Sequence, residues 1–184
     1  AKLLGLPMPG GPAVEKWALA GNGTRFPLPR PMKGREDPHF SFAGLKTAVR
    51  HAAMHEAPLS EKTIADLCAS FQAAVCDSVS DRVRHAMRAV TTNFPDKAHR
   101  PFVVAGGVAA NKALRQTLVE VANEYDFSFH APPLELCGDN GVMIAWAGAE
   151  LLSQGKSDML DAPARPRWPL DSDAPKAIGA GVKA

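Results

Sequence analysis

The sequence is poor in the features that mark secreted, membrane-spanning or strongly charged proteins. It has only three cysteines, Cys68, Cys76 and Cys137, and no CxxC pair, which argues against a disulfide framework and for reduced thiols. No apolar run approaches the ~20 residues of a membrane-spanning helix, and no charged segment followed by a long apolar one opens the chain. The net charge of +2 is too small to indicate nucleic-acid binding by itself. We therefore expect a cytoplasmic protein, not bound to a membrane, with one large domain or two small lobes.

Hydrophobic periodicity predicts alternating helices and strands in the second half of the chain. Ser60 is a good N-cap for a long helix to about Val90, because apolar residues follow it at three- and four-residue spacing. The segments after it predict a strand at 101–107, a helix at 111–125, a strand at 126–133 and a helix at 140–153. This order with short links is typical of a βαβ unit in an α/β fold with a parallel sheet.

The first half is less regular and rich in proline and glycine. We expect a tight turn at Gly10 and Gly11 and a short helix beginning at Pro12. Residues 21–38 predict an exposed connection or an extended edge, followed by a short strand in "HFSFAG" and a helix over 44–55. The expected domains are an inter-lobe helix and insertion at 1–58, a lobe at 59–155 and an extended tail at 156–184. Two strands are few for so many helices, and "AKLLGL" resembles the end of a helix. We therefore expect further strands before Ala1, in a longer protein.

The turn "AGGVAAN" is the first candidate site. A strand that ends in Gly106 and Gly107 and leads into a helix at Asn111 brings free N–H groups and the positive end of a helix dipole together. Glycine lets a phosphate or a base approach the backbone closely, and an Asn side chain can bind a base or a ribose. The alternative is that Asn111 only caps the helix.

Two further candidates are acidic. Asp139, in "LELCGDNG", precedes a helix and is either an N-cap or a hard metal ligand. Because the carboxyl ends of parallel strands line the ligand crevice, we expect Asp139 and Asn111 to face the same cleft. Glu15 follows Gly11 by one helical turn and suits ribose hydroxyls, although a solvent-exposed Glu is the simpler interpretation taken by itself.

Two other patterns carry weaker signals. His51 and His55 form HxxxH, a spacing that can hold zinc, but we favour surface histidines because the Glu of HExxH is absent. Basic residues usually form a solvated face and would touch phosphates only if they converged; they are Arg82, Arg84, Arg88, Lys97 and Arg100, with Lys33, Arg35 and Lys46 elsewhere.

Five stretches in register carry a family resemblance: "AKLLGLPMPGGPAVEKWA", "FSFAGLKTAV", "VVAGGVAANKALR", "ELCGDNGVMIAWAG" and "RPRWPL". Together they resemble the family of tRNA threonylcarbamoyladenosine synthesis proteins, formerly described as O-sialoglycoprotein endopeptidases or glycoproteases. The resemblance implies an actin-like, sugar-kinase-like lobe of the ribonuclease H-like kind. Its sheet is mostly parallel, flanked by helices and incomplete here.

The resemblance also implies an activity and a site. The activity is transfer of threonylcarbamoyl from threonylcarbamoyl-adenylate to adenosine 37 of tRNAs that read codons beginning with A. Gly11, Glu15, Gly106, Gly107 and Asn111 would bind the nucleotide. Asp139 would be one ligand of an iron or zinc ion in the full-length protein.

The family's other metal ligands, a histidine pair in an N-terminal lobe, and one nucleotide-binding Asp are not in this chain. We therefore expect the chain alone to be inactive and metal-free. The implied partners are tRNA, a paralogous actin-like subunit and an ATPase subunit; a homodimer of this chain is also possible. We assign no catalytic residue.

Other functions stay open. An ATP-binding sugar or acetate kinase of this fold would use the same glycine turn, but no catalytic Asp or phosphate loop is visible. A non-catalytic scaffold paralogue would not need both Asn111 and Asp139. No Ser-His-Asp or Cys-His set supports a protease.

Overall fold

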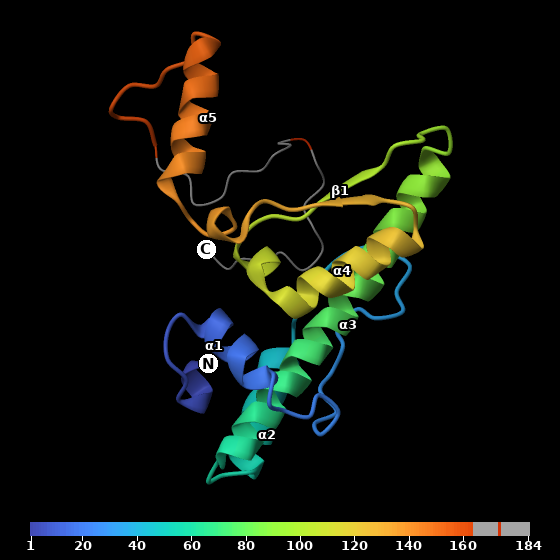
Figure 1. The fold of residues 1–184 in the computed structure, drawn as a ribbon, viewed down its shortest axis with the longest axis vertical. Coiled ribbons are helices and arrows are strands. Elements are labelled where there is room, and N and C mark those ends of the chain that lie inside the picture. Colours follow the sequence, from blue (N-terminus) through green and yellow to red (C-terminus); the bar gives the residue numbers. More distant parts are fainter. Residues whose placement is uncertain (164–172, 174–184) are drawn as a thin grey trace. The chain divides into compact units, whose positions relative to one another are not determined.

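The computed structural model describes residues 1–163 and 173, and the chain divides into two compact units, 1–140 and 141–184. We describe each unit by itself. Along the chain the elements are η1 (Lys2–Leu4), α1 (Gly10–Ala18), α2 (Leu45–His55), α3 (Glu61–Asn93), β1 (Pro101–Val103), η2 (Gly107–Ala110), α4 (Lys112–Glu124), β2 (Ser128–His130), η3 (Leu134–Leu136) and α5 (Gly141–Ser153) (Figure 1).

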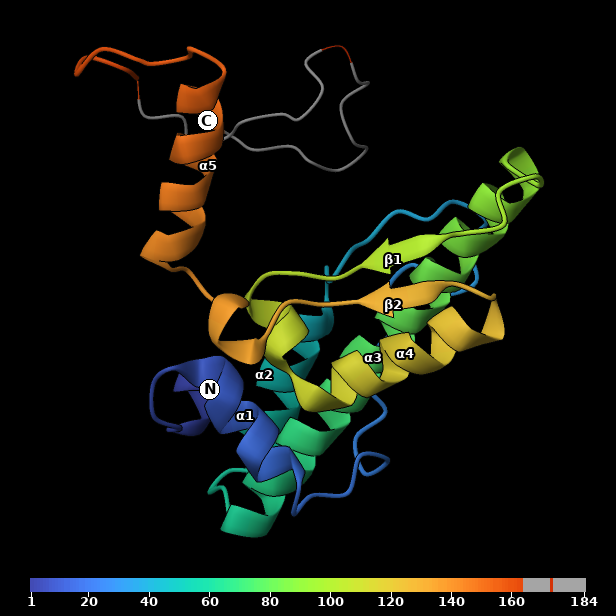
Figure 2. The ribbon, with the colours of Figure 1, turned by 45° about the horizontal axis from the view of Figure 1, so that its top comes forward.

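Helix α3 is the element against which the rest of the first unit packs (Figures 1 and 2). It begins as predicted, with the Ser60 hydroxyl accepting a hydrogen bond from the Thr63 N–H at 3.1 Å, and it continues to Asn93, slightly beyond the predicted end. Helices α1 and α2 lie along its N-terminal half, and α4 lies along its C-terminal half. The core is therefore three adjoining clusters spread along one helix.

The βαβ prediction is confirmed. Strands β1 and β2 pair in parallel, with Pro101 opposite Ser128 and Val103 opposite His130, and α4 connects them. Helices α3 and α4 lie on the same face of the two strands (Figure 2). This face carries Phe102 and Phe129, whose rings meet edge to face with centroids 6.0 Å apart. Among the described residues no strand pairs with the other edge of β1.

Two local predictions are wrong. Residues 39–42 form no strand, because no described strand lies beside them to complete the hydrogen-bond ladder, and Phe40 and Phe42 are exposed. Gly10 and Gly11 do not form a tight turn but are the first two residues of α1, which begins after an extended Pro9. Pro12 therefore falls in the first helical turn, where its missing N–H costs no hydrogen bond.

Residues 21–38, which we call the strap, run along α3 and are attached to it at intervals, so they are not a loose connection. The backbone N–H of Asn22 donates to Asp66, and that of Phe26 donates to Ser70. Further along, Arg30 forms an ion pair with Asp77 at 2.9 Å, and the Gly34 N–H donates to Asp81. Near the end of the strap, Arg82 of α3 donates to the carbonyls of Arg35 and Asp37. The polar side of α3 thus holds the strap in register.

Gly21, at the start of the strap, is required by packing. A Cβ atom at this position would lie 2.0 Å from the Ala65 carbonyl oxygen and 2.9 Å from the Ala69 Cβ. Any side chain would therefore push the strap away from α3.

The expectation that the basic residues form a solvated face is wrong for Arg82, which is buried. It is 1% exposed, pairs with Asp81 and is part of the fold. Arg84 pairs with Glu124, and Arg88 donates to the Tyr125 hydroxyl. These arginines stabilise the structure and do not converge on an open surface.

The three cysteines are free thiols, and Cys68 and Cys137 are buried. Burial also raises the pKa of the Cys68 and Cys76 thiols, which suits the packing role expected for both on their helix.

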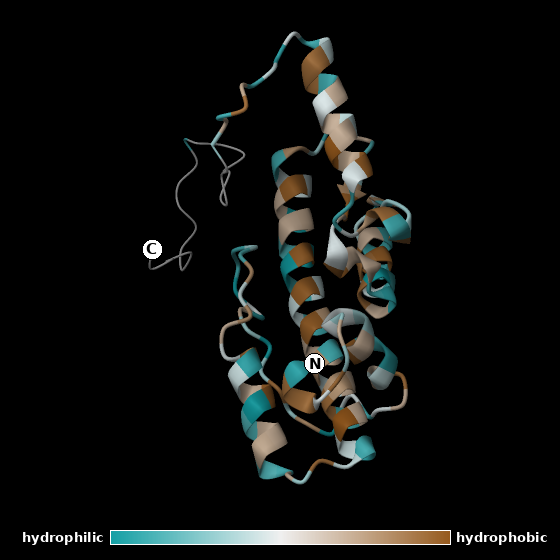
Figure 3. Ribbon diagram, turned by 90° about the vertical axis from the view of Figure 1, so that its left-hand side faces the viewer, coloured by the Kyte–Doolittle hydropathy of each residue, from teal (hydrophilic) through white to brown (hydrophobic). Residues whose placement is uncertain are grey.

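The second unit contains α5, whose residues are all exposed. Many of its residues are hydrophobic (Figure 3). Large apolar side chains account for much of its surface, with Trp146 70% and Leu152 68% exposed. The expected exposed apolar surface is therefore present, and what covers it stays a prediction. Within the described residues, no helix combines the length and apolar character needed to cross a membrane.

Residues 156–163 form no helix or strand, while "RPRWPL" lies outside the described residues. The predicted domain boundaries after residues 58 and 155 stay predictions.

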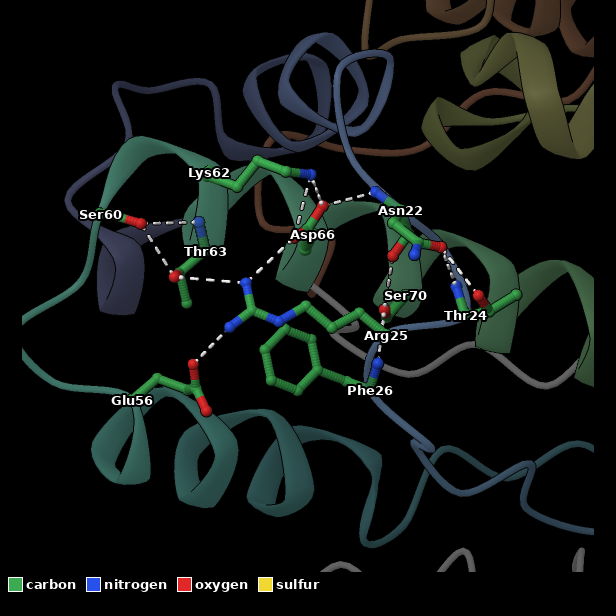
Figure 4. Close-up of polar contacts among 10 residues, drawn as sticks. All are labelled: Asn22, Thr24, Arg25, Phe26, Glu56, Ser60, Lys62, Thr63, Asp66 and Ser70. Atoms are coloured by element: carbon green, nitrogen blue, oxygen red, sulfur yellow. Dashed lines mark hydrogen bonds and ion pairs between the residues drawn. The ribbon is translucent and has the colours of Figure 1, made fainter.

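The attachment of the strap to α3 can be tested through the buried carboxylate of Asp66, which residues of the strap and of α3 contact (Figure 4). The Asn22 N–H, then Lys62 and Arg25, lower the pKa of Asp66 to about 2. Because the folded pKa lies below the unfolded value of about 3.9, ionised Asp66 stabilises the fold above pH ~4, and this contribution is lost as pH falls toward ~2.

We expect Asp66→Asn to lower the urea midpoint at neutral pH and to flatten its fall between about pH 4 and 2. Asp158→Asn, a substitution of an exposed carboxylate in the second unit, is the control. Acid-unfolding curves of equal steepness for wild type and Asp66→Asn would contradict this role.

Candidate nucleotide-binding site

The structure brings the "PGGPAVE" segment and the "AGGVAAN" turn together. The Glu15 carboxylate of α1 accepts a hydrogen bond from the backbone N–H of Lys112, the first residue of α4, at 2.6 Å. The two residues are 97 positions apart in sequence. They meet because α1 and α4 both pack on α3, α1 through Ala18 and its neighbours and α4 through Leu114 and Leu118.

Asn111 occupies the N-cap of α4, as the simpler interpretation predicts. Its Oδ1 accepts from the Leu114 N–H at 2.8 Å, and its Nδ2 donates to the side-chain oxygen of Gln72 on α3 at 3.0 Å. The amide is thereby held in one orientation, half-buried at the mouth of the turn. Each of its polar atoms keeps capacity for one more hydrogen bond.

Glu15 decides the electrostatics of this helix end. A carboxylate is favourable at a helix N-terminus, and here it uses an N–H that would otherwise be open to an anion. A phosphate placed beside Glu15 would meet a like charge. The position suits hydroxyl donors better, because the second Glu15 oxygen has no hydrogen bond among the described residues.

The glycines differ in what the fold requires of them. Gly106 has a φ of 83°, a conformation that favours glycine. Gly107 and Gly11 have no positive φ, and a Cβ atom on either would meet nothing within 4 Å. Neither packing nor these backbone angles therefore explain glycine at 107 or 11, and both positions leave open space beside the backbone.

Arg115 links the loops that follow the two strands. Its Nε donates to the carbonyl of Ala109 at 3.1 Å, and one terminal nitrogen donates to the carbonyl of Pro132 at 3.2 Å and to the Cys137 sulfur at 3.5 Å. The turn after β1 and the segment leading to Asp139 therefore contact the same guanidinium.

Asp139 is exposed, and the described residues contain no group of three or more His, Cys, Asp or Glu side chains able to hold a metal. One carboxylate does not make an iron or zinc site, so these residues alone do not fit the ion. His51 and His55 also lie exposed on α2, in keeping with surface histidines.

The predicted site residues do not line the cavity that the first unit contains. A cavity of about 630 Å³ lies beside β1 and the C-terminal half of α3, among apolar side chains such as Val83, Met87, Phe94 and Phe102. Gly11, Glu15, Asn111 and Asp139 are not part of its lining. The shared cleft expected for Asn111 and Asp139 stays a prediction.

Two residues at the site, Gln72 and Arg115, are not predicted from sequence patterns. Gln72 is a single polar residue beside the apolar stripe of α3, and Arg115 follows Asn111 by one helical turn. Spacing of four residues marks a shared helix face. It does not say which carbonyls a guanidinium reaches.

Comparison with known proteins identifies relatives over almost the whole chain. A family model described as TsaD: tRNA N6-adenosine threonylcarbamoyltransferase matches residues 1–146. Curated proteins named tRNA N6-adenosine threonylcarbamoyltransferase match 98% of this chain: those of Bartonella bacilliformis and Bartonella tribocorum are 56% and 58% identical over 186 residues, and that of Brucella anthropi 56% over 181. The chain spans about half the length of these relatives, 50–51%.

The contacts of Arg115 predict that it stabilises the loops after both strands. Arg115→Met should leave the Ala109 carbonyl without its guanidinium donor and the Pro132 carbonyl with only the weaker Cys137 thiol, at a cost of about 1–3 kcal/mol in unfolding free energy. Amide hydrogen exchange should speed up in two separate segments, 106–110 and 132–138, while α4 itself stays protected.

Gln116→Ala, on the exposed side of the same helix, is the matched control. Arg115→Lys should restore only part of the protection, because an ammonium lacks the planar fork. If exchange rises evenly along the chain, or in neither segment, Arg115 does not couple the two loops.

Proposed function

The chain belongs to the tRNA N6-adenosine threonylcarbamoyltransferase family, and we propose that it is the C-terminal part of such a transferase. In the full-length protein the reaction moves threonylcarbamoyl from threonylcarbamoyl-adenylate to N6 of adenosine 37 in tRNAs that read codons beginning with A. The site at α4 holds the adenosine part of the adenylate.

The observation that carries this proposal is the contact between Glu15 and Lys112. It joins the two segments in which the sequence predicted nucleotide-binding residues, although they are far apart in the chain. The open space beside Gly11 and Gly107 supports the same assignment, because it leaves room for a planar base or a ribose against the backbone.

The polar groups suggest how the adenosine is held. The second oxygen of Glu15 accepts from ribose hydroxyls, and the remaining capacity of the Asn111 amide binds a hydroxyl or a base nitrogen. The phosphate lies away from Glu15, since like charges repel.

The chemistry requires mainly positioning. The N6 amine attacks the carbamoyl carbonyl carbon, the C–N bond forms, and the C–O bond to the phosphate breaks as AMP leaves with the electron pair and N6 loses a proton. A mixed anhydride is already activated, so holding the two substrates in line supplies much of the acceleration. The proton lost from N6 passes to water.

The metal belongs to the full-length protein in this proposal. Asp139 supplies one ligand of an iron or zinc ion, and the remaining ligands lie outside this chain.

The fold we propose is the actin-like, sugar-kinase-like lobe, in which further strands continue the sheet beyond the unpaired edge of β1. The apolar cavity beside β1 supports this extension, since its lining side chains need a cover. The proposed location is the cytoplasm, and the proposed partners are tRNA, a paralogous actin-like subunit and an ATPase subunit.

The nucleotide site is tested by Asn111→Ser. Serine still caps α4, so the helix stays intact, but its side chain is too short to place a donor where the amide lies. We expect this variant to bind a non-hydrolysable adenylate analogue about tenfold more weakly in calorimetry, the effect of roughly one lost hydrogen bond.

Gln116→Ala is again the control and should bind like wild type. Equal affinity of wild type and Asn111→Ser would remove Asn111 from the site. If wild type co-expressed with the N-terminal half of the Bartonella bacilliformis relative does not bind the analogue at all, the scaffold alternative is favoured.

The metal assignment is tested together with activity. We expect this chain alone to hold no stoichiometric iron or zinc and to modify no tRNA. Co-expression with the N-terminal half of the Bartonella bacilliformis relative should supply the missing ligands and restore both. Asp139→Asn should then lose the metal, whereas Asp158→Asn should keep it. Modification by this chain alone, or metal retained without Asp139, would refute these assignments.

A further inference from the structure

The outward face of α2 is a basic surface that the nucleotide site does not use. Helix α2 packs on α3 and the strap through Leu45 and Ala53, with Ala48, Val49 and Ala52 half-buried on the same side. The residues on its other side are exposed, and they are Lys46, Thr47, Arg50, His51, Met54 and His55. We call these six residues the α2 face.

The charged residues of the α2 face are all positive, although the chain as a whole is nearly neutral, with 21 Lys and Arg against 19 Asp and Glu. Residues 38–55 contain no acidic residue. Lys46 and Arg50, four residues apart, lie side by side on this face.

The cations of the α2 face are not neutralised by a carboxylate of the described residues, unlike four arginines on α3 and the strap. Arg25, Arg30, Arg82 and Arg84 each pair with a carboxylate. Lys46 and Arg50 make no ion pair with any residue in the described part of the chain. Glu56, the nearest acid in sequence, is held by Arg25 at 2.6 Å and lies 3.6 Å from His55. The two cations therefore remain available to an external anion.

We infer that the α2 face binds the sugar–phosphate backbone of tRNA; this inference rests on the proposed function, whose acceptor is tRNA. Unpaired cations on an exposed helix suit a regularly charged polyanion, which needs no pocket. Phe42, 45% exposed just before α2, adds a ring on which an unpaired base can stack. The histidine pair is explained as part of this surface, because the described residues offer no third ligand for a metal.

The test measures tRNA binding by the whole chain as a function of salt. Lys46→Gln/Arg50→Gln removes two charges and keeps good helix formers. We expect it to bind unmodified tRNA on the order of tenfold more weakly at about 100 mM salt. The slope of log K against log[salt] should become less steep by about 1.5, since each phosphate contact contributes roughly 0.7–0.9.

Two controls isolate the surface. Lys97→Gln/Lys156→Gln removes the same charge from exposed sites elsewhere and should leave the slope unchanged. Lys46→Arg/Arg50→Lys exchanges the residues, keeps both charges and should bind like wild type.

The outcomes separate this inference from the proposed function. If both Gln double variants weaken binding equally, only net charge matters and the α2 face is not the contact. If the chain binds the adenylate analogue but not tRNA at about 50 mM salt, the inference fails and the proposed function stands. If it binds neither, both fail. If the Lys46→Gln/Arg50→Gln variant binds tRNA normally but loses an acidic protein partner, the surface belongs to that protein and the inference is overturned.

Discussion

The first unit depends on one constraint, the need to cover a long helix on several sides. Helix α3 has 33 residues, a length of about 50 Å, and its surface alternates between apolar stripes and a polar one. The apolar stripes are covered by α1, α2 and α4, and the polar one by the strap. Because α1 and α4 are both fixed to α3, the contact between Glu15 and Lys112 follows from two helix packings and not from local sequence.

The polar side of α3 explains how charge is distributed over the molecule. Asp66 and Arg82 are buried, and a buried charge is tolerated only when it is paired and hydrogen-bonded. The strap supplies some of those partners through Arg25 and through its own backbone groups, and α3 itself supplies Lys62 and Asp81. Asp66, Asp77 and Asp81 of α3 are thus paired with arginines of α3 and the strap. Lys46 and Arg50 of α2 face outward without a paired carboxylate among the described residues, so a nearly neutral chain has a local positive surface.

Both units have exposed apolar surfaces because the two-stranded sheet of the described residues is too small to cover the apolar faces of the helices. Strand β1 has an unpaired edge beside a 630 Å³ apolar cavity, and α5 exposes Trp146 and Leu152. The chain spans about half the length of its curated relatives. In the proposed function, the residues of the full-length protein that this chain lacks would complete the nucleotide site and supply the other ligands beside Asp139.

The sequence by itself determined what depends on local periodicity and caps. The apolar stripe after Ser60 predicted α3, glycine and Asn111 marked the start of α4, and the strand–helix–strand order predicted the parallel pairing of β1 and β2. The failures were the strand at "HFSFAG", which needed a partner strand, and the solvated role of Arg82. Tertiary structure alone decided that Glu15 reaches α4, that Arg115 joins two loops and that the strap follows α3. These contacts link residues distant along the chain, so their geometry is set by how helices pack and by which buried polar groups need partners, and no local pattern records either.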